Sequence, residues 1–345
     1  MSTPTRPSLV PHWLALAEEL VGRAAPRLDA LNLFPVPDAD TGTNMLATLT
    51  AARTAADACP AQDDAGAVLA HAGAAALDSA RGNSGMLLAV SLAGMAEPLR
   101  GRERVDAFAL AAAFGAADRA ARQALSDPRE GTILTVLSAA ARSLARSSTQ
   151  APDTPAVAGD ADPAVRLGPA VTVMLADCVQ AVEETESLLA PLTRAHVVDA
   201  GAVGLLWVFE ALRAVVTGTP VDEELATALH GYVEGAHAAE GEPAAAAEAP
   251  TEGAVEVMGT LTLTPLAAAE LRRRLADVGD AVILAPVGTA RDAQGRVPWR
   301  VHVHVPRAED AIGPLRAAGD VEGLAVTDLA EPSHGDAAPD GCHGR

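Results

Sequence analysis

Apolar residues recur at three-and-four spacing through most of the first 236 positions, which is the pattern of helices that bury one face. Gly and Pro punctuate the joints between these segments, and none of them alternates like a strand. The spacing predicts eight or nine helices, over residues 13–31, 45–56, 65–80, 86–99, 105–125, 133–144, 165–189, 203–216 and 223–236. We therefore expect residues 8–236 to form an all-α antiparallel unit.

The pattern changes beyond residues 237–253, whose sequence HAAEGEPAAAAEAPTEG predicts a solvated linker. Strand-like segments follow at 255–264, 280–286, 297–305 and 324–329, with helical segments at 265–278 and 308–318. The order β-α-β-β-α-β is typical of a small α+β ferredoxin-like unit, here over residues 254–330. The polar residues 331–345 are expected to be a disordered tail, and residues 147–162 a surface loop.

The composition and charge of the chain favour some classes of fold and binding partner over others. Hydrophobic residues make up 49% of the 345 positions but aromatic residues only 2%, which favours a core of closely packed Ala, Leu and Val on helices. The formal charge of −20 disfavours nucleic acid as a partner. A nucleotide remains compatible, because metal ions and helix N-termini supply positive charge locally. No transmembrane segment or signal peptide is evident, so we predict a cytoplasmic protein.

The strongest local signal is the segment NLFPVPDADTGTNM, residues 32–45. Asp38 and Asp40 lie one residue apart just before a predicted helix, and carboxylates with substrate phosphates are the usual ligands of Mg²⁺. Residues 41–44 begin the helix, where unpaired N–H groups favour an anion. The alternative is that Asp40 or Thr41 only caps the helix.

Three further segments place Gly beside Asn, Ser, Thr or Asp at a predicted helix start: RGNSG at 81–85, REGT at 129–132 and VDAG at 198–201. Each alone is typical of an ordinary helix cap. Together, four such starts predict one polar rim at the end of a helical bundle.

A family resemblance joins these segments. PVPDADTGTNM, ARGNSGMLLA, EGTILTVLSAA and VVDAGAVGLL resemble, in the same order, segments of the DhaL (DAK2) family. The form with Phe-Pro-Val-Pro before the Asp pair is similar to the kinase subunit of bacterial fatty acid kinase. This resemblance implies an antiparallel helical barrel of about eight helices that holds Mg-ATP at one end.

By the same resemblance, Asp38 and Asp40 would bind Mg²⁺, with Asn32 standing near the place of a third Asp in dihydroxyacetone-specific members. The implied ATP- or ADP-binding residues are Thr41, Gly42, Thr43, Asn44, Asn83, Ser84, Thr132, Asp199, Ala200 and Gly201. Phosphoryl transfer asks mainly for charge neutralisation and alignment, and a carboxylate acceptor is already ionised at neutral pH. No catalytic base is therefore assigned.

The resemblance implies an ATP- and Mg²⁺-dependent kinase subunit that phosphorylates a fatty acid presented by a DegV-like lipid-carrier protein. One alternative is a glycerone (dihydroxyacetone) kinase subunit, and another is a non-catalytic nucleotide-binding scaffold. A homodimer is a reasonable expectation for a protein of this kind.

In the second unit, His302 and His304 alternate within VHVHV and so share one face of a predicted strand. Such a pair suits a metal site or a polar patch. The related family has a cysteine near the first strand, where this chain reads Ala254-Val255-Glu256. Without an obvious third ligand, we expect a structural or solvent-facing pair in preference to a metal site.

Overall fold

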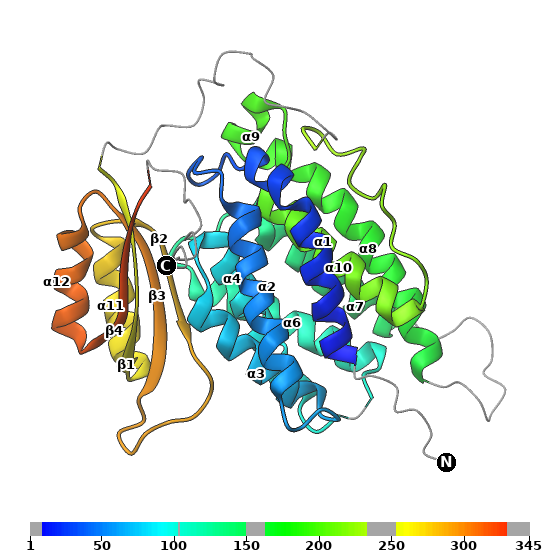
Figure 1. Cartoon of the computed structure of the whole chain (residues 1–345), viewed down its shortest axis with the longest axis horizontal. Helices are drawn as coiled ribbons and strands as arrows, with labels where there is room; N and C mark the ends of the chain where they lie inside the picture. The colour runs from blue at the N-terminus through cyan, green and yellow to red at the C-terminus, as the bar shows by residue number, and fades with distance from the viewer. Residues whose placement is uncertain (1–8, 103, 150–162, 233–252, 330–345) are drawn as a thin grey trace, which may run out of the picture.

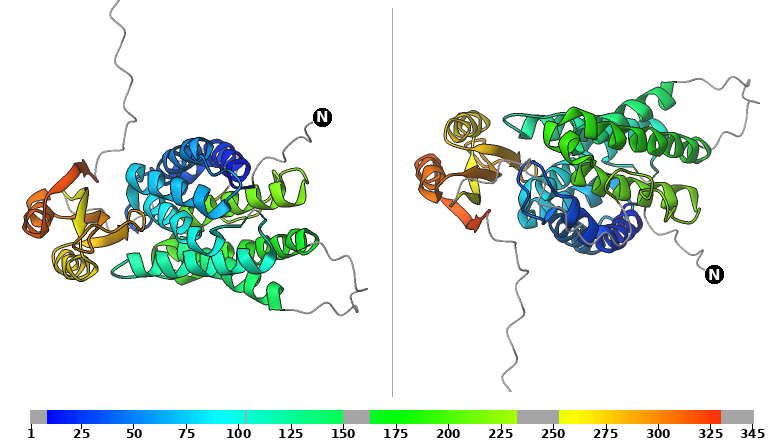
Figure 2. Two further views of the ribbon diagram at one scale, coloured as in Figure 1. Left: turned by 90° about the horizontal axis from the view of Figure 1, so that it is seen from below. Right: turned by 90° about the horizontal axis from the view of Figure 1, so that it is seen from above.

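A helix-rich region and a smaller unit with a four-stranded sheet lie side by side in the computed structural model (Figures 1 and 2). The structure describes residues 9–102, 104–149, 163–232 and 253–329. Residues 237–252 of the expected linker, the tail 331–345 and most of the expected loop 147–162 fall outside these ranges.

Within the described residues, the helical region contains ten helices. They are α1 (Leu9–Leu31), α2 (Thr41–Ala58), α3 (Ala65–Ser79), α4 (Gly82–Gly94), α5 (Ala96–Leu99), α6 (Ala107–Ala124), α7 (Ile133–Thr149), α8 (Pro163–Leu188), α9 (Ala190–Ala195) and α10 (Ala200–Thr217).

Small side chains let these helices approach closely. α1 packs against α2 and α10, and α7 packs against α6 and α8. At Gly73 on α3, an added Cβ would lie only 2.6 Å from Ala93 Cα on α4. The few large rings fill the wider gaps, as where Phe114 and Phe209 meet with centroids 5.2 Å apart. The Ala-rich composition thus produces a tightly packed core with few aromatic residues.

Two of the predicted helices differ from the structure. The helix expected over 86–99 is divided into α4 and α5 at Met95. Residues 223–231, expected to be helical, form successive turns with hydrogen bonds from residue i+3 to residue i, as from Leu229 N to Ala226 O. Ala226, Leu229 and Tyr232 are buried at a spacing of three, which suits such turns better than an α-helix. Residues 233–236 lie outside the described residues.

The second unit contains β1 (Val255–Leu263), α11 (Pro265–Ala276), β2 (Asp280–Pro286), β3 (Val297–Val305), α12 (Ala308–Ala318) and β4 (Val321–Asp328). This order along the chain is the one that the sequence pattern predicts. All strand pairs are antiparallel, and the sheet order is β2-β3-β1-β4.

The two faces of this sheet have different partners. Val301, Val303 and Val305 of β3 pack with α11 and α12 in the core of the second unit. The alternate residues of β3, such as His302, lie on the other face. There Met258 and Ile283 join the hydrophobic core of the helical region. Strands β1, β2 and β3 are therefore covered on both faces, by helices of their own unit on one and by the helical region on the other (Figure 1), whereas β4 is mostly exposed.

The edge strand β2 is joined directly to the helical region. Ser126, in the segment between α6 and α7, donates its backbone N–H to Val282 O at 3.0 Å. Leu125 and Ile283 form an antiparallel β-bridge at the same place. This junction fixes the position of β2 beside the starts of α4 and α7.

Among the described residues, α10 is the one helix long and apolar enough, by length and composition, to cross a membrane. In the structure 78% of that stretch is buried, because α10 packs against α1, α7 and α8.

Candidate functional site

The segment that joins α1 to α2 holds the two predicted metal-binding carboxylates. Asn32 donates a side-chain hydrogen bond from Nδ2 to Asp38 Oδ1, so the structure brings these two predicted ligands together. Asp40 occupies the N-cap position of α2, but its side chain makes no capping hydrogen bond. Its carboxylate therefore does not serve the helix in the way that the capping alternative requires.

Both carboxylates carry raised pKa values. Burial raises the pKa of Asp38, although hydrogen bonds from Asp40 and Asn32 oppose the change. Burial and the nearby charge of Asp38 raise the pKa of Asp40 to about 8. Two carboxylates that share a partly buried loop repel each other when both are ionised. This donor set of two carboxylates and an amide oxygen fits a hard cation such as Mg²⁺.

The start of α2 is capped from α1 by Asp29, a residue that the sequence pattern did not single out. Asp29 Oδ1 accepts from the backbone N–H groups of Gly42 at 2.6 Å and Thr43 at 3.0 Å. Its Oδ2 accepts from Thr43 Oγ1 at 2.8 Å. These donors were expected to hold phosphate, whereas here they hold α2 against α1. At Gly42 an added Cβ would lie 2.6 Å from Ala25 Cα, so this position requires glycine.

Residues 32–40 join α1 to α2 and carry the predicted metal ligands, and we call them the metal loop. The start of α4 lies against α2 beside this loop. At Gly85 an added Cβ would lie 2.8 Å from Thr48 Oγ1 of α2, and Gly82 takes a left-handed backbone conformation with φ of +58°. Asn83 and Ser84 follow in the first helical turn. A small pocket joins the two elements and is lined by Asn32, Phe34, Pro35, Val36, Asp38, Asp40, Thr41, Asn44, Gly82, Asn83, Ser84 and His304.

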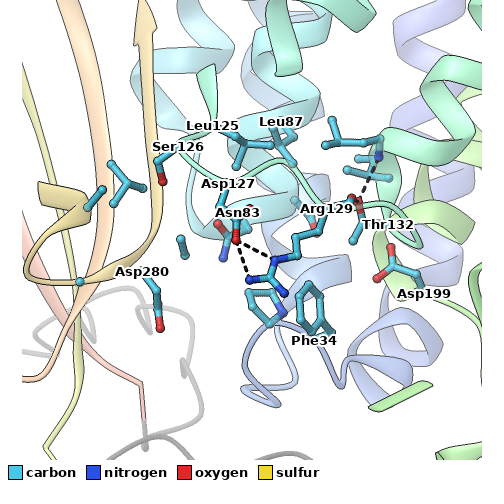
Figure 3. Close-up of a pocket in the computed structure, with 18 residues that line it drawn as sticks. Phe34, Asn83, Leu87, Leu125, Ser126, Asp127, Arg129, Thr132, Asp199 and Asp280 are labelled. Atoms are coloured by element: carbon cyan, nitrogen blue, oxygen red, sulfur yellow. Dashed lines mark hydrogen bonds and ion pairs between the residues drawn. The ribbon is translucent and has the colours of Figure 1, made fainter. Parts of the chain in front are cut away.

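A larger cavity of about 610 Å³ opens beside this pocket and shares Phe34, Pro35, Asn83 and Ser84 with it (Figure 3). Its volume is typical of a site for a small organic ligand or cofactor. It is lined by Phe34, Pro35, Asn83, Ser84, Leu87, Leu125, Ser126, Asp127, Arg129, Thr132, Ile133, Leu134, Asp199, Ala276, Gly279, Asp280, Ala281 and Val282.

Three helix starts converge at one end of the cavity. A Cβ added to Gly201, at the start of α10, would lie 2.8 Å from Ser84 Oγ and 3.6 Å from Ile133 Cβ. Ser84 belongs to the first turn of α4, and Ile133 begins α7. Helix N-termini present unpaired N–H groups and positive dipole ends, so their convergence favours an anion such as phosphate.

Thr132 and Asp199 line the same end, and Ala200 is buried beneath it. Thr132 Oγ1 donates to Arg129 O at 2.9 Å. Asp199 Oδ2 accepts from Ala202 N at 2.8 Å and so caps α10. Burial raises the pKa of Asp199 to about 7, although backbone N–H groups oppose the change. Asp199 therefore has a structural role as a cap as well as a place in the cavity wall.

The second unit covers the metal loop. His304 of β3 lines the small pocket together with Asp38 and Asp40. Glu256 of β1 accepts a hydrogen bond at Oε1 from Gly82 N at 3.0 Å, at the start of α4. The sheet face that carries these residues therefore meets the helical region at the starts of α2 and α4.

Glu256, His302 and His304 form a buried cluster whose potential ligand atoms all lie within 4.8 Å of one another. His302 Nε2 lies 2.8 Å from Glu256 Oε1, and its Nδ1 lies 3.1 Å from Ala281 O. Of the structural or solvent-facing pair that the sequence suggested, the solvent-facing alternative is wrong, because the side chains of His302 and His304 are 0% and 5% exposed. Glu256 therefore supplies a third potential ligand atom beside the two histidines.

Both pKa values that shift in this cluster, those of Glu256 and His304, are lowered. Burial opposes ionisation of Glu256, but the hydrogen bond and charge of His302 outweigh it and lower the pKa of Glu256 to about 2. Burial, followed by the neighbouring charge of His302, lowers the pKa of His304 to about 3. An ionised carboxylate beside an unprotonated imidazole is a donor set that suits a divalent cation.

Comparison with known proteins identifies the helical region. The profile of the DAK2 domain matches residues 35–214, which is more than half of the chain. The chain belongs to the DAK2 domain family. This family is associated with nucleotide-binding kinase subunits of the DhaL type. The DAK2 match includes Asp38, Asp40 and all four polar helix starts, but begins after Asn32.

Several curated bacterial proteins share this DAK2 region. Protein YloV of Bacillus subtilis is 33% identical over 211 residues, which cover 61% of this chain and 35% of YloV. The uncharacterized protein SH1689 of Staphylococcus haemolyticus is 32% identical over 195 residues, which cover 56% of this chain and 33% of that protein. The match thus spans about a third of the length of these relatives.

Sequence reasoning missed residues whose role depends on distant partners. Asp29 lies inside a helical pattern, and nothing local marks it as the cap of α2. Glu256 looks like one polar position of an alternating strand. Residues 276 and 279–282 belong to the second unit, and no local pattern predicts that they line a cavity of the first. Arg129 lies in the REGT segment and pairs with Asp127 through Nε at 2.8 Å.

Proposed function

We propose that this protein is the ATP- and Mg²⁺-dependent subunit of a kinase that phosphorylates the carboxylate of a fatty acid presented by a DegV-like carrier protein. The observation that carries the proposal is the shared wall of Phe34, Pro35, Asn83 and Ser84. It places the carboxylates of the metal loop directly beside a cavity that is large enough for a nucleotide. The Phe-Pro-Val-Pro form of the metal loop supports the fatty acid branch.

The residues have separate tasks in this proposal. Asp38 and Asp40, assisted by Asn32, hold Mg²⁺, which neutralises charge on the phosphates. Thr41, Asn44, Asn83 and Ser84 position the phosphates from the starts of α2 and α4. Thr132, Asp199, Ala200 and Gly201 border the rest of the nucleotide. Gly42 and Thr43 act indirectly, because their N–H groups bind Asp29 and so hold α2 in place.

The acceptor needs little help from acid–base chemistry. A fatty acid carboxylate is ionised near neutral pH, so its oxygen can attack phosphorus without losing a proton. Positioning and electrostatic stabilisation then account for catalysis. We assign no general base.

The cluster of Glu256, His302 and His304 is proposed as a second divalent-cation site. Support comes from its burial and from ligand atoms within 4.8 Å of one another. A cation there would tie β1 and β3 together and, through Glu256, to the start of α4. This would stabilise the junction of the two units beside the metal loop.

The architecture behind the proposal is a DhaL-like helical barrel at 8–236, a linker at 237–253 and a ferredoxin-like unit at 254–330. The sheet order β2-β3-β1-β4 with antiparallel pairing supports the second assignment. A cytoplasmic location, a homodimer and the absence of nucleic acid as a partner stay predictions from the sequence.

A calorimetric titration and a phosphoryl-transfer assay test the function. ATP is first titrated into the protein by calorimetry with and without Mg²⁺, and binding that requires Mg²⁺ is expected. Labelled ATP is then incubated with the protein and a fatty-acid-loaded DegV-like carrier, and label is expected in an acyl phosphate. Transfer to dihydroxyacetone instead would favour the glycerone kinase alternative. Tight Mg-ATP binding with no transfer to either acceptor would favour a scaffold.

A further inference from the structure

The cavity and the small pocket beside it are lined by acidic side chains. Asp127, Asp199 and Asp280 lie in the wall of the cavity, and Asp38 and Asp40 lie in that of the pocket. The phosphates of a nucleotide are also negatively charged, so they need positive partners where they bind. Mg²⁺ and helix N-termini supply part of this positive charge. A cationic side chain in the same wall would further reduce the repulsion between phosphates and carboxylates.

Arg129 is such a side chain. Among the described residues it is the one arginine that lines either the cavity or the small pocket, and the chain contains no lysine. The remaining basic side chain, His304 of the small pocket, belongs to the buried cluster with Glu256 and His302. Arg129 is therefore the fixed positive charge that the described residues place in the cavity wall.

The backbone on either side of Arg129 is held in place. Before it, Ser126 donates its N–H to Val282 O of β2 at 3.0 Å. Arg129 O itself accepts from Thr132 Oγ1 at 2.9 Å, next to the start of α7. The segment therefore presents Arg129 from a fixed backbone, so a ligand has only to redirect its side chain.

The Arg129 side chain lies in the open cavity. Figure 3 shows it between Asn83 on one side and Thr132 with Asp199 on the other. It is 61% exposed and makes no part of the hydrophobic core. Asn83 lies in the first turn of α4, and Thr132 directly precedes α7. Arg129 thus shares the cavity with two helix N-termini, which also favour an anion.

The partner that Arg129 has in this structure is easily exchanged. Its Nε and Nη2 lie 2.8 Å and 2.6 Å from Asp127, and both contact the same oxygen, Oδ2. The strongest Arg–carboxylate pairs instead make parallel hydrogen bonds to both oxygens. The Asp127 side chain is 66% exposed, and ion pairs that water screens in this way add little to stability. A phosphate group offers the guanidinium several oxygens in the geometry that this pair lacks.

We propose that Arg129 is a ligand of the nucleotide's phosphate chain and that it leaves Asp127 when the nucleotide binds. The inference rests on the proposed kinase function, to which it adds a side chain that contacts the substrate. Binding breaks the ion pair with Asp127 and forms one with phosphate oxygens, and no covalent bond changes in this step. The same guanidinium would stabilise the negative charge that develops on the transferred phosphoryl group.

Asp127 is a competitor of the nucleotide under this proposal. Its ion pair with Arg129 must break before phosphate can bind the guanidinium, and its carboxylate also repels phosphate directly. These two effects are separable, because the competition needs Arg129 whereas the repulsion does not. Removing the Asp127 charge should therefore tighten nucleotide binding more when Arg129 is present than when it is absent.

Calorimetry on the whole chain tests the proposal with Mg-ATP and with adenosine, which carries no phosphate. The variants are Arg129→Ala, Arg129→Lys, Asp127→Asn and the double variant that combines Arg129→Ala with Asp127→Asn. The matched control is Arg316→Ala, at an exposed position on α12 outside the walls of both pockets. Circular dichroism compares the helical content of all variants.

Arg129→Ala should bind Mg-ATP about tenfold more weakly than the wild type, since a charge-assisted pair with phosphate is lost, and should bind adenosine equally well. Arg129→Lys should fall between the two, because lysine keeps the charge without the planar fork. Asp127→Asn should tighten Mg-ATP binding, and by a larger factor in the wild-type background than in the Arg129→Ala background. Arg316→Ala should match the wild type.

Mg-ATP binding by Arg129→Ala equal to that of the wild type would overturn the inference and leave the kinase function standing. An equal loss of ATP and adenosine affinity would also overturn it, because Arg129 would then have a structural role in the cavity wall. An equal effect of Asp127→Asn in both backgrounds would overturn the exchange between Asp127 and phosphate. A wild type that binds no Mg-ATP would overturn the proposed function, and the inference with it.

Discussion

Glu256 of β1 accepts a hydrogen bond from the backbone N–H of Gly82, 174 residues earlier in the chain, at 3.0 Å. The contact joins the sheet to the start of α4, one residue before Asn83. It places an ionised carboxylate at a helix N-terminus, where the dipole favours negative charge. The second unit therefore touches the candidate site through a side chain that binds the backbone of α4 as well as through the cavity wall.

The Glu256 contact predicts a pH-dependent contribution to stability. Its pKa is lowered from 4.5 to about 2, so its contribution is present above pH 4.5 and is lost as pH falls towards 2. Replacing Glu256 by Gln should cost up to about 3 kcal/mol at pH 7, and less at each step below pH 4.5. Urea unfolding of wild type and variant between pH 3 and 7 measures the difference. A difference in the free energy of unfolding that stays constant over that range would contradict the lowered pKa of Glu256. The control is Glu270→Gln, at an exposed position on α11.

Replacing a carboxylate of the metal loop should weaken Mg²⁺-dependent nucleotide binding without unfolding the protein. Asp38→Asn and Asp40→Asn each remove a charged ligand from a loop outside any helix, so helical content by circular dichroism should stay unchanged. Calorimetry with Mg-ATP should show binding at least tenfold weaker than in the wild type. The matched control is Asp63→Asn, an exposed carboxylate away from the cavity. Normal Mg-ATP binding by either loop variant would rule out its role as a ligand.

Removing the Asp29 carboxylate that caps α2 should lower the free energy of unfolding. Asp29→Ala leaves the N–H groups of Gly42 and Thr43 without their carboxylate, which should cost about 1 to 2 kcal/mol in the free energy of unfolding. Asp29→Asn keeps an acceptor oxygen and should lose less. Chemical denaturation at pH 7 compares the two variants. Equal stability of Asp29→Ala and the wild type would show that the cap is not formed in solution.

The Glu256–His302–His304 cluster predicts a metal that copurifies with the protein. After dialysis, mass spectrometry of the wild type should find close to one divalent transition metal ion per chain. His302→Ala should remove most of it, because two remaining ligands hold a metal weakly. His12→Ala, at an exposed position on α1, should leave the metal content unchanged. The site would be refuted if wild-type protein from cells grown with zinc and manganese contained no metal and still bound none when these ions were added to it.

Removing the second unit separates the two halves of the cavity. A fragment of residues 1–253 should keep its helical content and bind Mg-ATP, because the metal loop and the four helix starts belong to the helical region. It should melt at a lower temperature, since the core loses Met258 and Ile283 as packing partners. A fragment that does not fold would place the unit boundary elsewhere.

Local pattern predicted most elements of this fold. β2, β3 and α12 begin and end where alternation or helical spacing indicates. The clearest difference is the helix expected at 223–236. Ala226 and Leu229 are buried at a spacing of three, and they lie in successive turns instead of an α-helix. A periodic pattern shows which residues are buried but leaves open which short-range hydrogen bonds they make.

The features of the candidate site also fall into those that local sequence indicates and those that depend on long-range packing. The sequence alone determined the metal loop with Asp38 and Asp40, the four polar helix starts and the family, because these features are local and short motifs carry them. Only the tertiary structure decided that Asp29 caps α2, that Glu256 completes the histidine cluster, and that the turn after α11 forms a wall of the cavity. These pairings join residues far apart in the chain, and their geometry depends on how the sheet packs against the helical region.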